Sequence, residues 1–380
     1  MRIVNLCGPN PLSPESGGVG GVVYNINKRL VNDGMEIINI CYYKENFLKN
    51  TEIGTVIGVK VPHNEFLKMI TYALKSAVIS RKFEPDIIQS EGGSCFGASI
   101  AAKILNRNKK IIERAHGTHV GLINSMQRKT LHMRIFGGMY TNVIEKLTFR
   151  NADLIIAVSN LAKRELIKYY KIDPQKIKVI YNGVDTKYYR RNMPKQNARR
   201  RLNLDPEDKY SLFVGLDPYR KGIDIAIGAT RFVQLSNFKL IIIGKKDLSN
   251  QLKSNIIEKL IPVGLVSEKI KRLYYLASDV FIFPSRHEGF ALAPLEAMSC
   301  GLPVVISKYT GVNEVVKNKE AIVIKNLNGQ KYAKEITKII KNKNYANKLS
   351  QKARGLALKY SWDKVIKKYK LLYNSIKMEK

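Results

Sequence analysis

The sequence predicts an α/β protein built from two doubly wound domains. Short apolar strands alternate with amphipathic helices, as in the strands at residues 2–7, 36–43 and 152–159. These strands are continuous β-branched runs, which are typical of parallel sheets covered on both faces. The alternation breaks once, at residues 186–209, and then starts again. A chain of 380 residues also has room for two domains of about 100–200 residues each.

The first predicted domain covers residues 1–190 and is completed by an amphipathic C-terminal helix at residues 361–380. Its strands are expected at residues 2–7, 36–43, 85–92, 109–117, 152–159 and 177–184, with helices at residues 21–34, 99–108 and 160–172. The second predicted domain covers residues 191–360. Its strands are expected at residues 211–216, 239–244, 279–285, 303–307 and 321–325, with helices at residues 224–235, 267–277 and 294–301.

The break between the two halves is polar and basic and contains Pro194 and Pro206, which is typical of a linker or hinge. Two doubly wound domains in tandem are expected to face each other across a cleft between the carboxyl ends of their strands. Ligands of such sheets bind there, beside helix N-termini. Functional motifs are therefore expected in the loops that follow strands.

Composition favours a cytoplasmic protein. No apolar run reaches the roughly 20 residues of a membrane span, and residues 1–18 lack the pattern of a signal peptide. The four cysteines are far apart and form no C-x-x-C pair, which fits a reducing compartment. The net charge of +34 has two interpretations, a genome bias toward AT-rich codons or an anionic partner. Nucleic acid is the less favoured partner, because no known nucleic-acid-binding motif accompanies the charge.

The segment PESGGVGGVVYN, residues 14–25, follows the first strand and is rich in glycine. Glycine allows positive φ and a close approach of a ligand to the backbone, which makes Gly18 a candidate binding residue. The segment matches neither the dinucleotide fingerprint nor a P-loop. The alternative is a tight turn without a ligand.

His116 lies in ERAHGTHVG, just past a strand end, where residues of a cleft are expected. We interpret it as a substrate-contacting residue, the alternative being a structural loop histidine. A metal pair with His119 lacks a visible third ligand.

Arg220 and Lys221 precede Gly222 in FVGLDPYRKGID, ahead of a predicted helix. Cations are unfavourable at a helix N-terminus, so an anion such as a diphosphate would explain them. The alternative is a solvated charged turn.

Glu288 and Glu296 stand seven residues apart in SRHEGFALAPLEAMSCGLPVV, residues 285–305. Glu296 is expected in the first turn of a helix, where a carboxylate stabilises the helix dipole. That role does not explain Glu288, which stands before Gly289. Carboxylates accept hydrogen bonds from sugar hydroxyls, so the pair indicates a site for a ribose and a second sugar.

These motifs, taken in order, resemble family 4 glycosyltransferases, which are retaining, nucleotide-sugar-dependent enzymes of the GT-B fold with two Rossmann-like domains. The resemblance rests on EGFALAPLEAMSCGLPVV, RKGID, GVNEVV, ADLIIAVSNLAKREL, IKVIYNGVDTKYY, GGVGGV and the closing SWDKVIKKY, and it spans nearly the whole chain. It implies that the C-terminal helix crosses back onto the N-terminal domain.

The resemblance also implies roles for the candidate residues. Arg220 and Lys221 would neutralise the donor diphosphate, Glu296 would bind the ribose, and Glu288 would contact the transferred sugar. The donor site would further include Gly18, Gly289 and the amides of Phe290, Ala291 and Leu292, and His116 would lie near the reacting centre. No D-x-D sequence occurs, so no cofactor or metal is expected, and fixed positive groups would stabilise the leaving group instead.

Two positions depart from the family pattern. Leu216 stands where the family has arginine after the strand glycine, and Ala291 replaces the second glycine of E-G-F-G. Arg220 is a candidate substitute for the missing arginine. The amide of Ala291 remains accessible to a donor if its φ is negative.

We expect a retaining transfer to a hydroxyl acceptor by front-side attack, with the donor phosphate taking the proton. A lipid-linked glycan is one possible acceptor, and the segment at residues 129–150 is a candidate amphipathic helix for contact with an anionic membrane. The alternatives are an ordinary packed helix for that segment, and a nucleotide-sugar epimerase, a phosphorylase or a non-catalytic polyanion binder for the whole chain.

Overall fold

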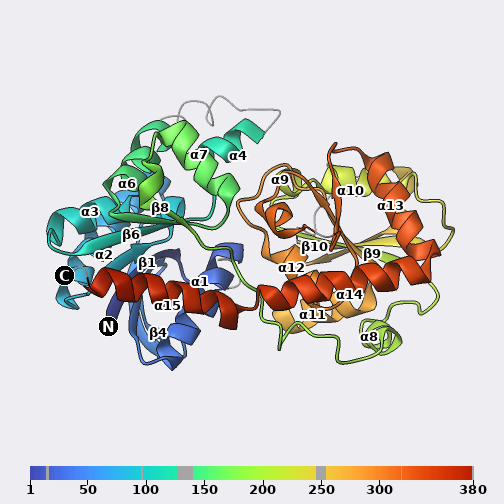
Figure 1. The fold of residues 1–380 in the computed structure, drawn as a ribbon, viewed down its shortest axis with the longest axis horizontal. Helices are drawn as coiled ribbons and strands as arrows, with labels where there is room; N and C mark the ends of the chain where they lie inside the picture. Colours follow the sequence, from blue (N-terminus) through green and yellow to red (C-terminus); the bar gives the residue numbers. More distant parts are fainter. Residues whose placement is uncertain (14–16, 96, 126–139, 245–253, 318, 379–380) are drawn as a thin grey trace. The chain divides into compact units, whose positions relative to one another are not determined.

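The computed structural model describes residues 1–13, 17–95, 97–125, 140–244, 254–317 and 319–378. The chain forms two compact units (Figure 1). Unit 1 comprises Met1–Asn182 and Trp362–Lys380, and unit 2 comprises Gly183–Ser361. The sequence-based division placed these limits at residues 190 and 360. Of the candidate amphipathic segment at residues 129–150, residues 129–139 lie outside the described residues, and the rest forms a π-helical turn (Tyr140–Glu145) and most of α6 (Lys146–Asn151).

Unit 1 is built on a sheet with the strand order β3-β4-β2-β1-β5-β6-β7-β8. These strands are β1 (Arg2–Pro9), β2 (Glu36–Tyr43), β3 (Phe47–Thr51), β4 (Gly54–Lys60), β5 (Ile87–Ser90), β6 (Lys110–Ala115), β7 (Leu154–Ala157) and β8 (Ile177–Val179). Pairing is parallel throughout the described ladders except at the edge, where β3 runs antiparallel to β4. The parallel core confirms the α/β prediction, whereas the hairpin at the edge was not anticipated.

Helices cover both faces of this sheet. They are α1 (Gly17–Asn32), α2 (Glu65–Lys82), α3 (Ala98–Leu105), α4 (His119–Ser125), α6 (Lys146–Asn151), α7 (Asn160–Tyr170) and α15 (Trp362–Met378). Alternate residues of β1 point to opposite faces: Val4 and Leu6 join the core under α2 and α3, and Cys7 packs with Val23 of α1. The two faces of β1 are therefore both buried, as its continuous apolar run predicts.

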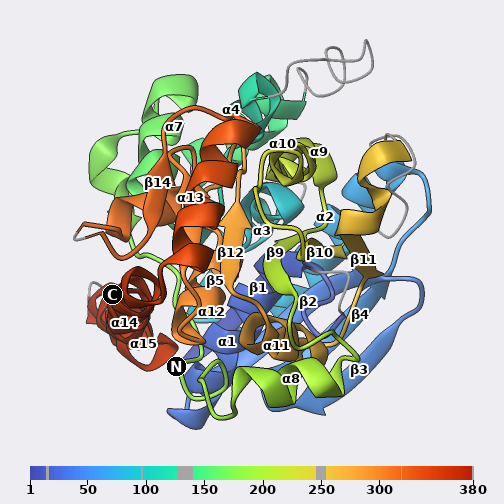
Figure 2. The ribbon, with the colours of Figure 1, turned by 90° about the vertical axis from the view of Figure 1, so that its right-hand side faces the viewer.

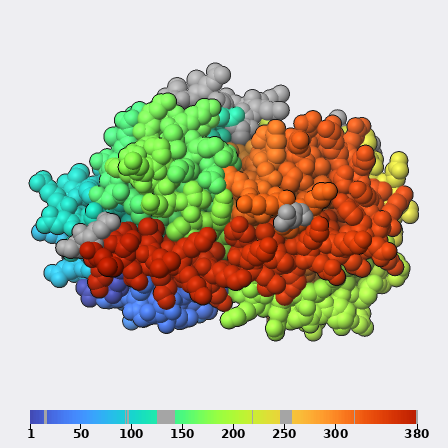
Figure 3. Space-filling view, in the orientation of Figure 1, coloured from blue at the N-terminus to red at the C-terminus, as the bar shows by residue number. Residues whose placement is uncertain are grey.

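The C-terminal helix α15 belongs to unit 1, as predicted. Trp362, Tyr369 and Tyr373 on its inner face are buried, and Arg29 Nε of α1 lies 2.8 Å from a carboxylate oxygen of Asp363. The Tyr369 ring lies over the guanidinium of Arg114, 5.0 Å from the ring centroid. In Figure 3 the red surface of α15 lies beside the blue surface of the N-terminal segments. Helix α15 thus completes the core of the first domain.

Unit 2 contains a parallel sheet with the order β11-β10-β9-β12-β13-β14. The strands are β9 (Lys209–Gly215), β10 (Phe238–Gly244), β11 (Leu260–Gly264), β12 (Val280–Phe283), β13 (Val304–Ser307) and β14 (Ile322–Ile324). The helices are α8 (Lys195–Arg201), α9 (Pro218–Lys221), α10 (Ile223–Thr230), α11 (Glu268–Ala277), α12 (Leu292–Ser299), α13 (Gly329–Lys341) and α14 (Lys343–Lys359). One face packs on α10 and α13, whose buried residues form a core with β9, β10 and β12.

The predicted linker at residues 186–209 is part of unit 2 rather than a free connection. Its middle forms α8, which packs beside α11 (Figure 2). Lys195 and Arg199 of α8 both form ion pairs with Asp279, at 2.5 and 2.9 Å, and the guanidinium of Arg199 also lies over the Tyr210 ring. The linker prediction was wrong because basic residues that look solvated in sequence have intramolecular partners.

The described helices include none that is both long and apolar enough to cross a membrane.

Replacing Tyr369 by alanine tests whether α15 is part of the unit 1 core. We expect a loss of about 3–5 kcal/mol in the free energy of unfolding, as for other buried aromatic truncations. The single tryptophan, Trp362, lies in the same helix, so its fluorescence in urea reports on this unit. Leu371→Ala is the matched control, because Leu371 on the same helix is 71% exposed. Equal midpoints for both variants would contradict the packing role.

Candidate functional site

Arg220 and Lys221 follow the carboxyl end of β9, on the one-turn helix α9. Gly222 comes next, with φ +76°, and a Cβ atom there would lie 2.1 Å from the carbonyl oxygen of Pro284. Only glycine fits here. A Cβ atom would collide with the carbonyl oxygen of Pro284, and the left-handed conformation is strained for other residues. The backbone therefore turns sharply after the two cations and holds them against the loop that follows β12.

Glu288 is the anion that the two cations share. One of its carboxylate oxygens, Oε1, forms ion pairs with Arg220 and with Lys221. The Glu288 side chain is only 11% exposed and that of Lys221 17%. Burial alone would raise the pKa of the Glu288 carboxyl, but Lys221 and Arg220 outweigh it and hold that pKa below its ordinary value. The alternative of a solvated charged turn is therefore wrong.

The backbone around this cluster is fixed by hydrogen bonds. The amide of Glu288 donates to the carbonyl of Tyr309 at 3.2 Å, and the amide of Gly311 donates to the carbonyl of Glu288 at 2.9 Å. The hydroxyl of Ser285 donates to the carbonyl of Arg220 at 3.0 Å. These bonds join the loops after β9, β12 and β13, so the charged side chains are held by three strand ends.

Glu296 does not lie in the first turn of its helix, where the sequence placed it. Ala291 caps α12 with φ −74° and ψ 132°, and the helix begins at Leu292. Glu296 is thus in the second turn, and the expected stabilisation of the first turn does not apply. Its Oε2 accepts a hydrogen bond from the Tyr275 hydroxyl at 2.9 Å and lies 3.1 Å from Lys271 Nζ. A buried tyrosine and a partly buried lysine therefore orient this carboxylate.

The negative φ of Ala291 fulfils the condition set for its amide, and the side chains of Phe290 and Ala291 are buried. At the other departure from the family pattern, Leu216 is 43% exposed, while Arg220 occupies the ion-pair cluster. That Arg220 replaces the arginine of the family pattern stays a prediction.

His116 and Gly18 belong to unit 1. His116 follows β6, and its Nε2 lies 2.8 Å from Glu91 Oε2. Glu91 follows β5 and also accepts two hydrogen bonds from Arg114 Nη1, at 2.9 and 3.0 Å. Burial would raise the pKa of the Glu91 carboxyl, but Arg114 and His116 lower it. Glu91 was missed in the sequence, although its place at a strand end was the available signal.

The two histidines do not converge on one site. His119 begins α4, and its Nδ1 lies 3.0 Å from Glu145 Oε1, whereas His116 faces Glu91. Gly18 lies in the first turn of α1, not in a loop, because the helix begins at Gly17. The glycine-rich segment therefore contributes the amino end of a helix. Among the residues with described side chains, no group of three or more His, Cys, Asp or Glu side chains is placed to hold a metal ion.

Replacing Glu288 by glutamine should destabilise the protein by about 3 kcal/mol at neutral pH, the low end for breaking a buried ion pair, since Arg220 keeps 22% exposure. A lowered carboxyl pKa stabilises the fold above the unfolded value of 4.5, and this stabilisation disappears as the pH falls through the folded value. The difference between wild type and Glu288→Gln should therefore be constant from neutral pH down to about 5 and shrink below it.

Urea unfolding followed by circular dichroism at several pH values measures this difference. Glu258→Gln, at an exposed position of the same unit, is the control and should show no such dependence. A difference between wild type and Glu288→Gln that stays constant through the acid range would contradict the ion-paired state of Glu288.

Comparison with known proteins gives a consistent result for both units. Residues 16–188 match the family model described as Glycosyltransferase Family 4, and residues 194–356 match the model described as Glycosyl transferases group 1. An uncharacterized glycosyltransferase of Methanocaldococcus jannaschii is 27% identical over 99% of both chains. An Escherichia coli UDP-Gal:α-D-GlcNAc-diphosphoundecaprenol α-1,3-galactosyltransferase is 28% identical over 57% of this chain and 62% of its own length. The chain spans about half the length of the D-inositol 3-phosphate glycosyltransferases that it matches.

Solved structures with the same fold cover nearly the whole chain. Sucrose-phosphate synthase from Thermosynechococcus elongatus superposes with a TM-score of 0.84 at 18% identity, over 100% of this chain and 99% of the other. Anabaena HepE in complex with UDP-glucose gives 0.80 at 19% identity, over 99% and 100%. The two family models together span most of the sequence, and the fold is that of GT-B enzymes. The chain therefore belongs to the family 4 glycosyltransferases.

Proposed function

We propose that this glycosyltransferase moves a sugar from a nucleoside diphosphate sugar to a hydroxyl acceptor. The observation that carries the proposal is the cluster of Arg220, Lys221 and Glu288 at the carboxyl ends of strands in unit 2. A carboxylate that accepts from sugar hydroxyls lies next to two cations that suit a diphosphate. Among the structural neighbours, HepE is solved with UDP-glucose, which supports a donor of this class.

The remaining donor contacts follow the loop into α12. In the proposal, the amides from Gly289 to Leu292 meet the phosphates and the sugar, since the amino end of a helix favours negative charge. Glu296 binds the ribose hydroxyls, and Tyr275 and Lys271 hold its carboxylate in one orientation. The roles of Gly18 near the donor phosphate and of His116 near the reacting centre stay predictions.

The proposed reaction retains the configuration of the sugar and needs no metal or other cofactor. The bond between the anomeric carbon and the diphosphate breaks while the acceptor oxygen bonds to the same face. The acceptor proton passes to the departing phosphate, whose negative charge Arg220 and Lys221 stabilise. Fixed cations of this kind do the work that a bound divalent metal does in other phosphate sites.

We further propose a lipid-linked glycan as the acceptor, with the enzyme in the cytoplasm at the membrane surface. The support is the E. coli relative, whose name specifies a diphosphoundecaprenol acceptor, together with the basic excess of the chain. The alternatives of an epimerase or a phosphorylase predict different products. Release of the nucleoside diphosphate only in the presence of acceptor would exclude the epimerase.

A thermal-shift panel of UDP-, GDP- and ADP-sugars tests the donor site. The donor should raise Tm, because ligand at 100 times its Kd adds about 2.7 kcal/mol of stability. Lys221→Ala should abolish this shift, and Lys334→Ala, at an exposed lysine of α13, should preserve it. No shift with any donor for the wild type, or equal shifts for both variants, would refute the proposed site.

The stereochemistry is tested separately by proton NMR of the product. With an α-linked donor, the anomeric coupling constant of the new glycosidic bond should be that of an α-linkage from the first turnovers. A β-linked initial product would contradict the front-side mechanism but would not contradict the proposed donor site.

A further inference from the structure

Helix α2 of unit 1 exposes a row of apolar side chains to solvent. Its members and their exposed fractions are Phe66 57%, Leu67 51%, Ile70 40%, Leu74 57% and Val78 50%. At 100° per residue they lie within an arc of about 120°. A helix on the surface of a water-soluble domain normally turns polar side chains outward. Single exposed apolar residues are common, but a contiguous row marks an interaction site.

The inner face of α2 shows that the helix is not rotated so that its core residues face the solvent. Tyr72, Ser76, Ala77 and Ser80 are buried, and the Tyr72 hydroxyl donates to the carbonyl of Ile40 in the sheet at 2.8 Å. The helix begins with a regular cap, because the Asn64 side chain accepts from two amides of the first turn. The helix is therefore fixed in its orientation, and its exposed face is built in.

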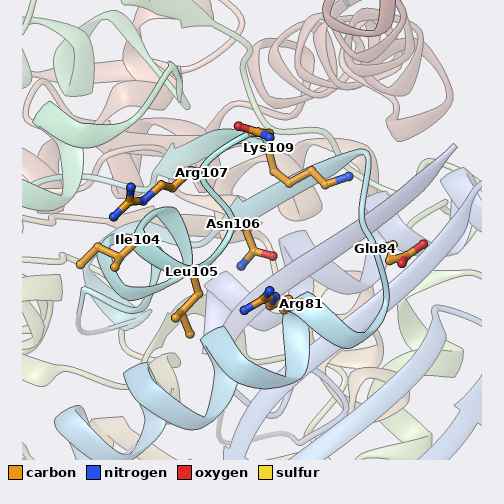
Figure 4. A pocket seen from close by; sticks show the side chains of 8 residues that line it. Arg81, Glu84, Ile104, Leu105, Asn106, Arg107 and Lys109 are labelled. Carbon is orange, nitrogen blue, oxygen red and sulfur yellow. The ribbon is translucent and has the colours of Figure 1, made fainter.

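The apolar surface continues onto the end of α3. Ile104 is 62% exposed and Leu105 38%, and both line a surface hollow with Arg81 at the end of α2. Figure 4 shows these side chains with Arg107 and Lys109 around the hollow.

Cations lie beside the C-terminal half of the row. Lys75, Arg81 and Lys82 are exposed on α2, and Arg107 and Lys109 follow α3. Among the acids of the same helix and hollow, Glu65 is paired with Lys68 at 2.6 Å, and Glu84 lines the hollow. An apolar stripe with basic residues beside it is the pattern of a helix that lies in the interface of an anionic bilayer. A second copy of the chain fits this face less well, because each copy carries a net charge of +34 and would repel the other.

We propose that α2 docks unit 1 on an anionic phospholipid bilayer, with the apolar row among the acyl chains and the cations at the headgroups. This surface differs from the segment at residues 129–150 that the sequence suggested. It involves none of the residues of the proposed donor site.

Co-sedimentation with phosphatidylcholine vesicles, with and without phosphatidylglycerol, tests the proposal on the full chain. Binding should require phosphatidylglycerol and should weaken as salt rises. Leu74→Glu with Val78→Glu should reduce the partition coefficient at least tenfold, since each buried leucine or valine contributes roughly that factor. Lys75→Gln with Lys82→Gln should reduce it roughly fivefold per cation.

Leu371→Glu is the matched control, because Leu371 on α15 is 71% exposed and lies outside the row; it should bind like wild type. Each variant should keep the wild-type Tm and the donor-induced shift, which separates loss of lipid binding from loss of the fold or of the donor site. A fluorescent reporter is available as well: Trp362 is the single tryptophan and is buried, so the emission of Leu74→Trp should shift to the blue on anionic vesicles.

Three results would overturn the proposal. They are no binding of the wild type to anionic vesicles, unchanged binding of the Leu74 and Val78 double variant, and dissociation of a wild-type dimer by that variant in sedimentation velocity without lipid. The last result would assign the row to a second copy of the chain.

Discussion

The buried ion pair between Arg114 and Glu91 is the interaction on which the arrangement of unit 1 depends. Both side chains are fully excluded from solvent, and a buried charge is tolerated only when it is paired. Arg114 is on β6 and Glu91 follows β5, so the pair links two adjacent strands at their ends. The ring of Tyr369 covers the guanidinium, and the hydroxyl of Tyr373 donates to Gln89. Without α15, the guanidinium of Arg114 would be exposed to water.

The same pair explains how His116 is held. The carboxylate that binds Arg114 also lies 2.8 Å from the His116 ring, so one residue connects the covered core with the loop after β6. Unit 2 repeats this arrangement with different residues, because Glu288 accepts from Arg220 and Lys221 where β9 and β12 end. In both units a carboxylate with a lowered pKa orders the cations at the carboxyl edge of the sheet, the edge at which doubly wound folds bind ligands.

The sequence predicted what depends on local pattern. The central strands β1, β5, β9 and β12 were found because their apolar runs are uninterrupted, and α15 because its apolar residues recur at helical spacing. The edge strand β3 was missed because most of its side chains are exposed. Its sequence therefore lacks the alternation of apolar and polar residues that marks a half-buried strand. Helix α2 was missed as well, because its outward face is apolar where a helical pattern requires polar residues.

The site was predicted less completely, because pairing across strands leaves no local signal. Glu91 and Arg114 are 23 residues apart, and their contact depends on the adjacency of β5 and β6. Glu288 and Lys221 were found separately, each as a strand-end residue, but the sequence did not indicate that they bind each other. The first-turn position of Glu296 was wrong since Pro294 was taken as the helix start, whereas the helix begins at Leu292.

The partners of individual cations bear on the two interpretations of the net charge. A genome bias toward AT-rich codons would scatter cations without regard to their surroundings. At α8, the basic residues Lys195 and Arg199 are used internally, in ion pairs with Asp279. At α2, the exposed lysines Lys75 and Lys82 lie beside the exposed apolar row. Two cations of α8 are thus used within unit 2, whereas the cations beside α2 are those to which the proposed bilayer docking would give a use.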